Sequence, residues 1–187
     1  MDDLYLKLVL EGNTSEFSYF VEKYKGMAFS IAFRIVDNRE DAEEVVQDSF
    51  LKAFKSLDKF RKDSKFSTWF YRIVVNNSLS RIRSKKPESI STDVEDIADI
   101  VIESVESAYR SLTLSEQKKF IHNALEELCA EDRLLLTLYY LNENSIDEIK
   151  EITGIVQENI KMKLHRARNK MYSVLNKNLK SEIKSIL

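Results

Sequence analysis

Residues 57–77 read LDKFRKDSKFSTWFYRIVVNN, a run that interleaves cations, aromatic rings and amides. Ser67 or Thr68 can cap a long helix that continues to about Arg83. From residue 52 to residue 86 there are eleven Lys and Arg against two acids, although the whole chain has a formal net charge of -2. Aromatic faces among cations suit single-stranded nucleic acid. Aromatic residues at helical spacing equally suit a core, so both interpretations stand here.

Two earlier helices are predicted from apolar stripes at helical spacing. Thr14 or Ser15 can cap the first, and Asn38 followed by Asp41 can cap the second. The stripe of the first helix is formed by Phe17, Phe20, Val21, Tyr24, Met27, Ala28, Ile31 and Ile35. That of the second is formed by Ala42, Val45, Val46, Ser49, Phe50, Ala53, Phe54 and Leu57.

A second helical block begins near Leu114 and ends in a basic helix. Its apolar stripes are Phe120, Ile121, Ala124, Leu125 and Leu128, then Leu134, Leu135, Leu138 and Tyr139. Ser145 and Glu148 form a capping box for a short helix, Gly154 suits the turn after it, and a long basic helix is expected over 156–176. This order is typical of a helix-turn-helix that binds DNA, although plain helical bundles also contain it.

The composition favours an all-α protein. Three Gly and one Pro among 187 residues leave few helix breakers, and 43% hydrophobic residues suffice for real cores. Residues 88–106 hold seven acids and no Lys or Arg, which favours a flexible acidic linker. We therefore expect two small helical domains, over 1–86 and 113–187, joined by a linker over 87–112.

Several function classes have no support in the sequence. One cysteine, Cys129, excludes an internal disulfide, and two distant histidines, His122 and His165, make a metal site unfavourable. No nucleophile–base grouping or phosphate-binding glycine loop is present. The acidic N-terminus lacks the pattern of a signal peptide, and no run approaches the ~20 apolar residues of a membrane helix. We expect a soluble, cytoplasmic protein that is not an enzyme, needs no cofactor and does not insert into a membrane.

The two blocks together favour promoter melting. One suits unpaired bases and the other the duplex major groove. A stand-alone helix-turn-helix regulator that does not bind polymerase is the alternative, but it would have no use for the first block. A helical adaptor without DNA contact would leave both basic clusters unexplained.

Runs of both blocks resemble conserved regions two and four of the bacterial extracytoplasmic-function, or group four, sigma factors of RNA polymerase. The matching runs are DAEEVVQDSFLKAF (41–54), FR (60–61), TWFYRIVVN (68–76), ALEEL (124–128), IDEI (146–149) and LHRAR (164–168). The resemblance covers nearly the whole chain in the family's order. It implies a sigma factor whose partners are core RNA polymerase, duplex and melted promoter DNA, and an anti-sigma factor.

The resemblance also implies site residues. The polymerase-docking set is Asp41, Glu44, Gln47 and Asp48. The minus-ten set is Phe60, Lys62, Ser64, Phe66, Trp69, Ile73, Asn76 and Asn77. The minus-thirty-five set, on the basic helix, is Asn159, Lys161, Met162, Lys163, His165 and Arg166.

Overall fold

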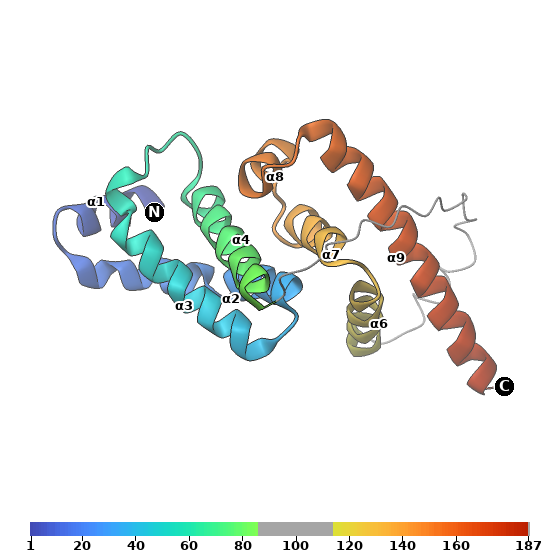
Figure 1. The fold of residues 1–187 in the computed structure, drawn as a ribbon. Helices are drawn as coiled ribbons and strands as arrows, with labels where there is room; N and C mark the ends of the chain where they lie inside the picture. The colour runs from blue at the N-terminus through green and yellow to red at the C-terminus, as the bar shows by residue number, and fades with distance from the viewer. Residues whose placement is uncertain (86–113, 187) are drawn as a thin grey trace. The chain divides into compact units, whose positions relative to one another are not determined.

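All regular structure that is described in this chain is helical. The computed structural model describes residues 1–85 and 114–186, and within them it contains only helices (Figure 1). The all-α prediction is therefore confirmed for these residues, while the expected linker over 87–112 lies outside them. The described chain groups into two compact units, residues 1–85 with 137–157, and residues 114–136 with 158–186. The domain limits expected from the sequence stay a prediction.

Three long helices form the body of the first unit. The α2, α3 and α4 helices pack pairwise against one another, and the short α1 helix precedes them (Figure 1). The elements are α1 (Asp2–Leu10), η1 (Thr14–Phe17), α2 (Ser18–Val36), α3 (Arg39–Lys55), η2 (Leu57–Lys59) and α4 (Phe66–Lys85).

Aromatic rings fill the space between these three helices. Phe20 of α2 and Phe66 of α4 have ring centroids 4.3 Å apart, and Phe50 of α3 lies 4.4 Å from Phe70 of α4. Phe20 and Phe70 are completely buried. Burying a large apolar side chain stabilises a fold by about 1.5–3 kcal/mol, so this chain of rings is a major source of the unit's stability. The two predicted apolar stripes are thus largely confirmed as core, with Phe54 of the second one partly exposed.

Helix starts were predicted with mixed success. The Asn38 side chain accepts a hydrogen bond from the Asp41 backbone N–H at 2.9 Å, which confirms the predicted cap of α3. The caps predicted at Thr14 or Ser15 are wrong, because η1 occupies those positions and α2 begins at Ser18. The predicted cap at Ser67 or Thr68 is also wrong, since α4 already begins at Phe66, whose ring is buried.

The α1 helix, which the sequence analysis did not predict, is fastened to α2 by one carboxylate. Asp2 accepts hydrogen bonds from the hydroxyls of Tyr19 at 2.8 Å and Tyr24 at 2.5 Å, and also from Lys23. Partial burial acts to raise the pKa of Asp2, but the hydrogen bonds from Lys23 and the two tyrosines outweigh it and lower that pKa. The Tyr5 ring of α1 stacks on Tyr19 with centroids 3.9 Å apart.

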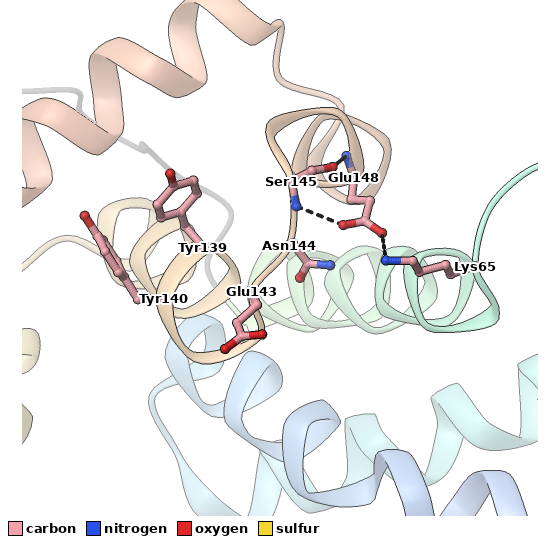
Figure 2. Close-up of a pocket in the computed structure, with 7 residues that line it drawn as sticks. All are labelled: Lys65, Tyr139, Tyr140, Glu143, Asn144, Ser145 and Glu148. Atoms are coloured by element: carbon pink, nitrogen blue, oxygen red, sulfur yellow. Dashed lines mark hydrogen bonds and ion pairs between the residues drawn. The ribbon is translucent and has the colours of Figure 1, made fainter.

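The remaining helices follow the predicted order. They are α6 (Leu114–Glu126), α7 (Ala130–Leu136), the π-helical turn η3 (Thr137–Leu141), α8 (Ile146–Thr153) and α9 (Gln157–Ile186). Two predictions for this block are confirmed at α8, namely the capping box at its start and the glycine turn at its end. Ser145 Oγ accepts from the Glu148 N–H, and the Glu148 carboxylate accepts from the Ser145 N–H at 2.8 Å (Figure 2). Gly154 ends α8 in the left-handed conformation, with φ of 76°.

The π-helical turn changes one sequence expectation. Tyr139 was assigned to a buried stripe, yet it is 38% exposed, and the neighbouring Tyr140 and Leu141 are more exposed still. A π-helix holds more residues per turn than an α-helix, so the stripe that begins with Leu134, Leu135 and Leu138 loses its phase at this point.

Candidate functional site

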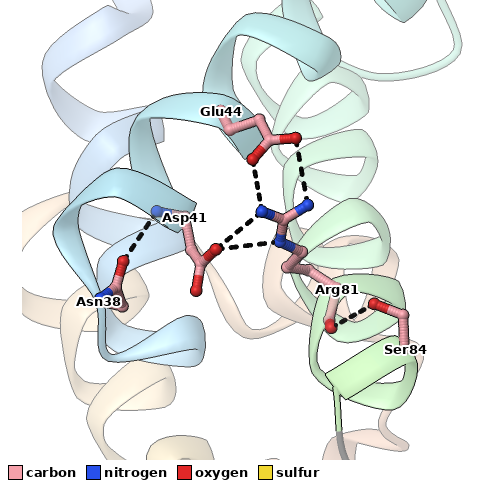
Figure 3. A network of polar contacts seen from close by, with 5 residues as sticks. All are labelled: Asn38, Asp41, Glu44, Arg81 and Ser84. Atoms are coloured by element: carbon pink, nitrogen blue, oxygen red, sulfur yellow. Dashed lines mark hydrogen bonds and ion pairs between the residues drawn. The ribbon is translucent and has the colours of Figure 1, made fainter.

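The acidic side of α3 carries the residues predicted to dock on polymerase. Glu44, Gln47 and Asp48 are exposed, whereas Asp41 is buried. Arg81 of α4 donates to Asp41 Oδ1 from Nε at 3.0 Å and from Nη2 at 2.8 Å, and to Glu44 from both terminal nitrogens (Figure 3). We call this arrangement of Asp41, Glu44 and Arg81 the α3–α4 clamp.

The clamp makes the carboxylates of the docking set electrostatically unequal, because Arg81 contacts Asp41 and Glu44. Hydrogen bonds with Asp41 and then Glu44 raise the pKa of Arg81, so the guanidinium stays charged. The single positive charge of Arg81 is shared by two carboxylates of the set, so the clamp keeps one net negative charge. Within the described part of the chain, Asp48 is the docking carboxylate that no cation contacts.

A second polar contact joins the same two helices. Lys52 Nζ donates to Asn77 Oδ1 at 2.5 Å, and Asn77 Nδ2 donates to Ser49 Oγ at 2.8 Å. Between this contact and the clamp lies a groove of about 230 Å³, lined by Glu44, Val45, Asp48, Lys52, Asn77, Ser80, Arg81 and Ser84. Asn77, expected from the resemblance to meet a base, thus holds α4 against α3.

The minus-ten set divides by exposure. Lys62 and Asn76 are exposed, Phe66 is 3% exposed inside the core, and Phe60, Ser64, Trp69, Ile73 and Asn77 are intermediate. The Phe60 and Trp69 rings lie 5.2 Å apart beside the loop that carries Lys62. The interpretation of these aromatic residues as core is therefore confirmed for Phe66. Phe60 and Trp69 are only partly buried, so they stay candidates for stacking on a base.

The loop that precedes α4 contains a strained residue and an ion pair. Lys62 has a φ of 62°, which a residue other than Gly adopts at a cost. Lys65 Nζ lies 2.8 Å from Glu148 Oε1, at a shallow polar pocket whose other lining residues include Tyr139 and Asn144 (Figure 2). Hydrogen bonding to Glu148 raises the pKa of Lys65.

The minus-thirty-five set lies on α9. Asn159, Lys161, Met162, His165 and Arg166 are exposed, while Ile160, Leu164 and Ala167 of the same helix are buried. Lys163 is half-buried, and its Nζ is 2.6 Å from Glu131 Oε2 of α7. Five of the six predicted residues therefore share an accessible face of the helix.

Sequence reasoning counted Arg81 among the cations but gave it no role. A signal was available, because Asn77 and Arg81 are four residues apart and so lie on one face of a helix. This shared face indicates one side of a contact, but the sequence does not show that the acidic helix α3 lies opposite it.

The described residues contain neither a candidate metal cluster nor a candidate membrane-spanning helix. No group of three His, Cys, Asp or Glu side chains is placed to hold a metal ion among them. Across the same residues, no helix combines the length and the apolar character needed to cross a membrane.

Family models match both blocks. Sigma-70 region 2 matches residues 20–88, and Sigma-70, region 4 matches residues 121–171. The ECF RNA polymerase sigma factor SigW of Bacillus subtilis is 33% identical in an alignment over 174 residues that covers 87% of this chain and 90% of that protein. The ECF RNA polymerase sigma-E factor of Escherichia coli K12 is 31% identical over 89% of this chain and 90% of its own length.

Solved structures give the same fold. The sigma factor RpoE of Bartonella quintana, in complex with the anti-sigma factor NepR, has 25% identity and a TM-score of 0.65 over 86% of this chain and 97% of that chain. CnrH, in complex with the cytosolic domain of CnrY, has 20% identity and a TM-score of 0.63, and covers 92% of this chain and 96% of its own.

Proposed function

The chain belongs to the extracytoplasmic-function RNA polymerase sigma factors, and we propose that it binds core RNA polymerase, directs it to particular promoters and helps to melt them. The observation that carries the proposal is the presence of both sigma regions, in order, in a chain that is 33% identical to SigW over 87% of its length. The chain itself performs no catalysis in this proposal and acts in the cytoplasm, where the polymerase is found.

Docking is assigned to Asp41, Glu44, Gln47 and Asp48. The exposure of the last three supports a contact with a basic surface of the polymerase. Because Arg81 offsets part of the charge of Asp41 and Glu44, Asp48 is the docking carboxylate with the largest expected electrostatic contribution. Complementary charge of this kind steers association and fixes its register.

Melting is assigned to the accessible residues of the minus-ten set, with Phe60, Trp69 and Asn76 nearest to the unpaired strand, while Phe66 and Asn77 support them from within the fold. Taking a base out of the stack costs a few kcal/mol, and stacking on an aromatic side chain contributes about 1–3 kcal/mol per base. These magnitudes are comparable, so capture of one base can tip the equilibrium without ATP hydrolysis. The exposed Lys62 and the partly exposed Trp69 ring support this assignment.

Reading of the minus-thirty-five element is assigned to Asn159, Lys161, Met162, Lys163, His165 and Arg166. Arg166 is exposed and is our choice for a base contact, because a bidentate arginine–guanine pair discriminates by about 1–3 kcal/mol. Exposed lysines such as Lys161 suit phosphate oxygens, which set register but not sequence.

An anti-sigma factor is a further proposed partner. The similar RpoE of Bartonella quintana forms a complex with the anti-sigma factor NepR. Its 25% identity and high coverage support an equivalent partner for this chain.

Run-off transcription tests the proposal directly. Purified chain and core RNA polymerase are combined on genomic DNA of the source organism, with core enzyme alone as the control. We expect discrete transcripts that require the chain and disappear with Asp48→Lys. Duplex binding by the chain alone, without assembly on core enzyme, would identify a stand-alone regulator instead.

A further inference from the structure

We propose that Arg81 is a positioning residue that fixes the promoter-reading helix α4 on the polymerase-docking helix α3. The inference rests on the proposed function, because docking and reading are assigned to these two helices. Arg81 belongs to neither set of contacts in that assignment. It acts through the helix geometry, so that docking of α3 also places the reading face of α4.

The shape of the clamp supports this role. One guanidinium contacts two carboxylates from successive turns of α3, Asp41 and Glu44 (Figure 3). A planar fork with fixed donor directions restricts both the separation and the rotation of the two partners, which a lysine cannot do. The Asp41 side chain is only 9% exposed, so its end of the clamp is sheltered from water and salt.

Two polar ties, one turn apart on α4, join this helix to α3. Arg81 supplies one and Asn77 supplies the other, through Lys52 and Ser49 of α3. The apolar contact between the helices, such as Phe50 against Phe70, holds them together but is not directional. Removing Arg81 therefore leaves the helices packed while one constraint on their register is lost.

Register matters because the reading residues are neighbours of the ties. Asn76 is exposed and adjacent to Asn77, and Ile73 lies one turn before it. The side chain of Asn76 lies away from the axis of α4. A small rotation of the helix about this axis therefore moves the amide away from the base that it is proposed to contact. Misplacement by about 1 Å can cost on the order of a hundredfold in rate.

A direct contact of Arg81 with DNA phosphate is the alternative. The side chain is 31% exposed, but four of its five N–H donors are directed at the two carboxylates of the clamp. Loss of a phosphate contact would lower the salt slope of DNA binding by about one unit, whereas loss of a positioning contact would not.

The test uses the full chain assembled with saturating core RNA polymerase. The variants are Arg81→Gln and Arg81→Lys, and the control is Arg83→Gln, which removes an exposed arginine from the same helix. Core affinity, the rate of promoter opening by permanganate reactivity, the salt slope and the unfolding midpoint are measured. We expect Arg81→Gln to slow opening by about tenfold or more, with core affinity changed less than about threefold. Arg81→Lys should also be slow, since it lacks the fork, and Arg83→Gln should match the unchanged chain.

Three results would overturn the inference. Opening at the unchanged rate by fully assembled Arg81→Gln holoenzyme would leave Arg81 with a structural role only. A salt slope lower by one unit would assign it to phosphate. Opening that is slow only in proportion to lost core affinity would assign it to docking. If Arg81→Gln does not fold, Arg81→Lys, which keeps the charge, decides among the same outcomes. Failure of the unchanged chain to assemble with core enzyme would instead refute the proposed function, and the inference with it.

Discussion

Lys163 of α9 and Glu131 of α7 form an ion pair with 2.6 Å between Nζ and Oε2. The lysine is half-buried, and the carboxylate of Glu131 offsets its positive charge. The ion pair distinguishes Lys163 from Lys161, although the two lysines belong to the same basic run of the sequence. Lys161, two residues earlier, is exposed.

We predict different salt dependences for the two lysines. Lys161→Ala should lower the slope of log K against log salt, for holoenzyme on promoter DNA, by about one unit. Lys163→Ala should lower it by clearly less, and should lower the unfolding midpoint because Glu131 loses its partner. Filter binding from low to moderate salt measures the slopes. Equal slopes for both variants would show that the ion pair opens on DNA.

Two carboxylates of the docking set should behave in opposite ways. Asp48→Lys changes an exposed residue, so stability should shift by less than ~0.5 kcal/mol while assembly with core enzyme is lost. Asp41→Asn weakens a sheltered charge-assisted contact and should cost about 1–3 kcal/mol of unfolding free energy. Native gels and denaturant unfolding measure the two quantities. Full assembly by Asp48→Lys would exclude this face from docking.

Asn76→Ala tests recognition of the melted strand. The side chain of Asn76 is exposed, so its removal should leave the fold intact. Promoter opening should slow, and preference should change at one minus-ten position, while binding to the upstream duplex stays nearly constant. Permanganate footprinting on promoter variants measures opening, and Ser80→Ala, exposed one turn later, is the control. Wild-type opening on every variant would remove Asn76 from the site.

The left-handed backbone at Lys62 predicts that one substitution, Lys62→Gly, makes the fold more stable and at the same time slows promoter opening. A φ above zero costs a residue with a Cβ roughly 1–2 kcal/mol, and glycine avoids this cost. Lys62→Gly should therefore raise the unfolding free energy by about 1 kcal/mol and slow promoter opening. Lys62→Asn, which tolerates the same backbone, separates loss of charge from relief of strain. A fall in stability for Lys62→Gly would contradict the strain argument.

The contact of Asp2 with α2 predicts a pH dependence. Its pKa in the folded protein lies below the ordinary value of 3.8, so its contribution to stability is present above that pH and is lost as the pH falls through the folded pKa. Asp2→Asn should lower the unfolding midpoint at neutral pH, and the difference from the unchanged chain should shrink below about pH 4. Thermal unfolding between pH 3 and pH 7 measures this, with Asp3→Asn as an exposed control. A difference independent of pH would contradict it.

Local patterns predicted much of the fold. The apolar stripes of α2 and α3, the Asn38 cap, the capping box at Ser145 and the turn at Gly154 all depend on residues close in sequence. All the residues that form each of these patterns lie within a few helical turns of one another, so the pattern can be recognised without knowing the fold.

Features that depend on distant contacts were not predictable. The α1 helix is held by Asp2 through residues of α2, and the extension of α4 to Phe66 depends on packing against Phe20. The role of Arg81 requires knowledge that α3 and α4 are neighbours. The resemblance supplied the site residues, but only the structure separates buried Phe66 and paired Lys163 from their exposed companions.

Trp69 is the single tryptophan of the chain, and it lies beside Phe60 at the aromatic face proposed to meet melted DNA. Its indole is only partly buried, so its emission depends on what covers that face. A base stacked on the ring would quench the fluorescence. If melted DNA meets this face as proposed, the emission of Trp69 reports strand capture without a label and in real time during initiation.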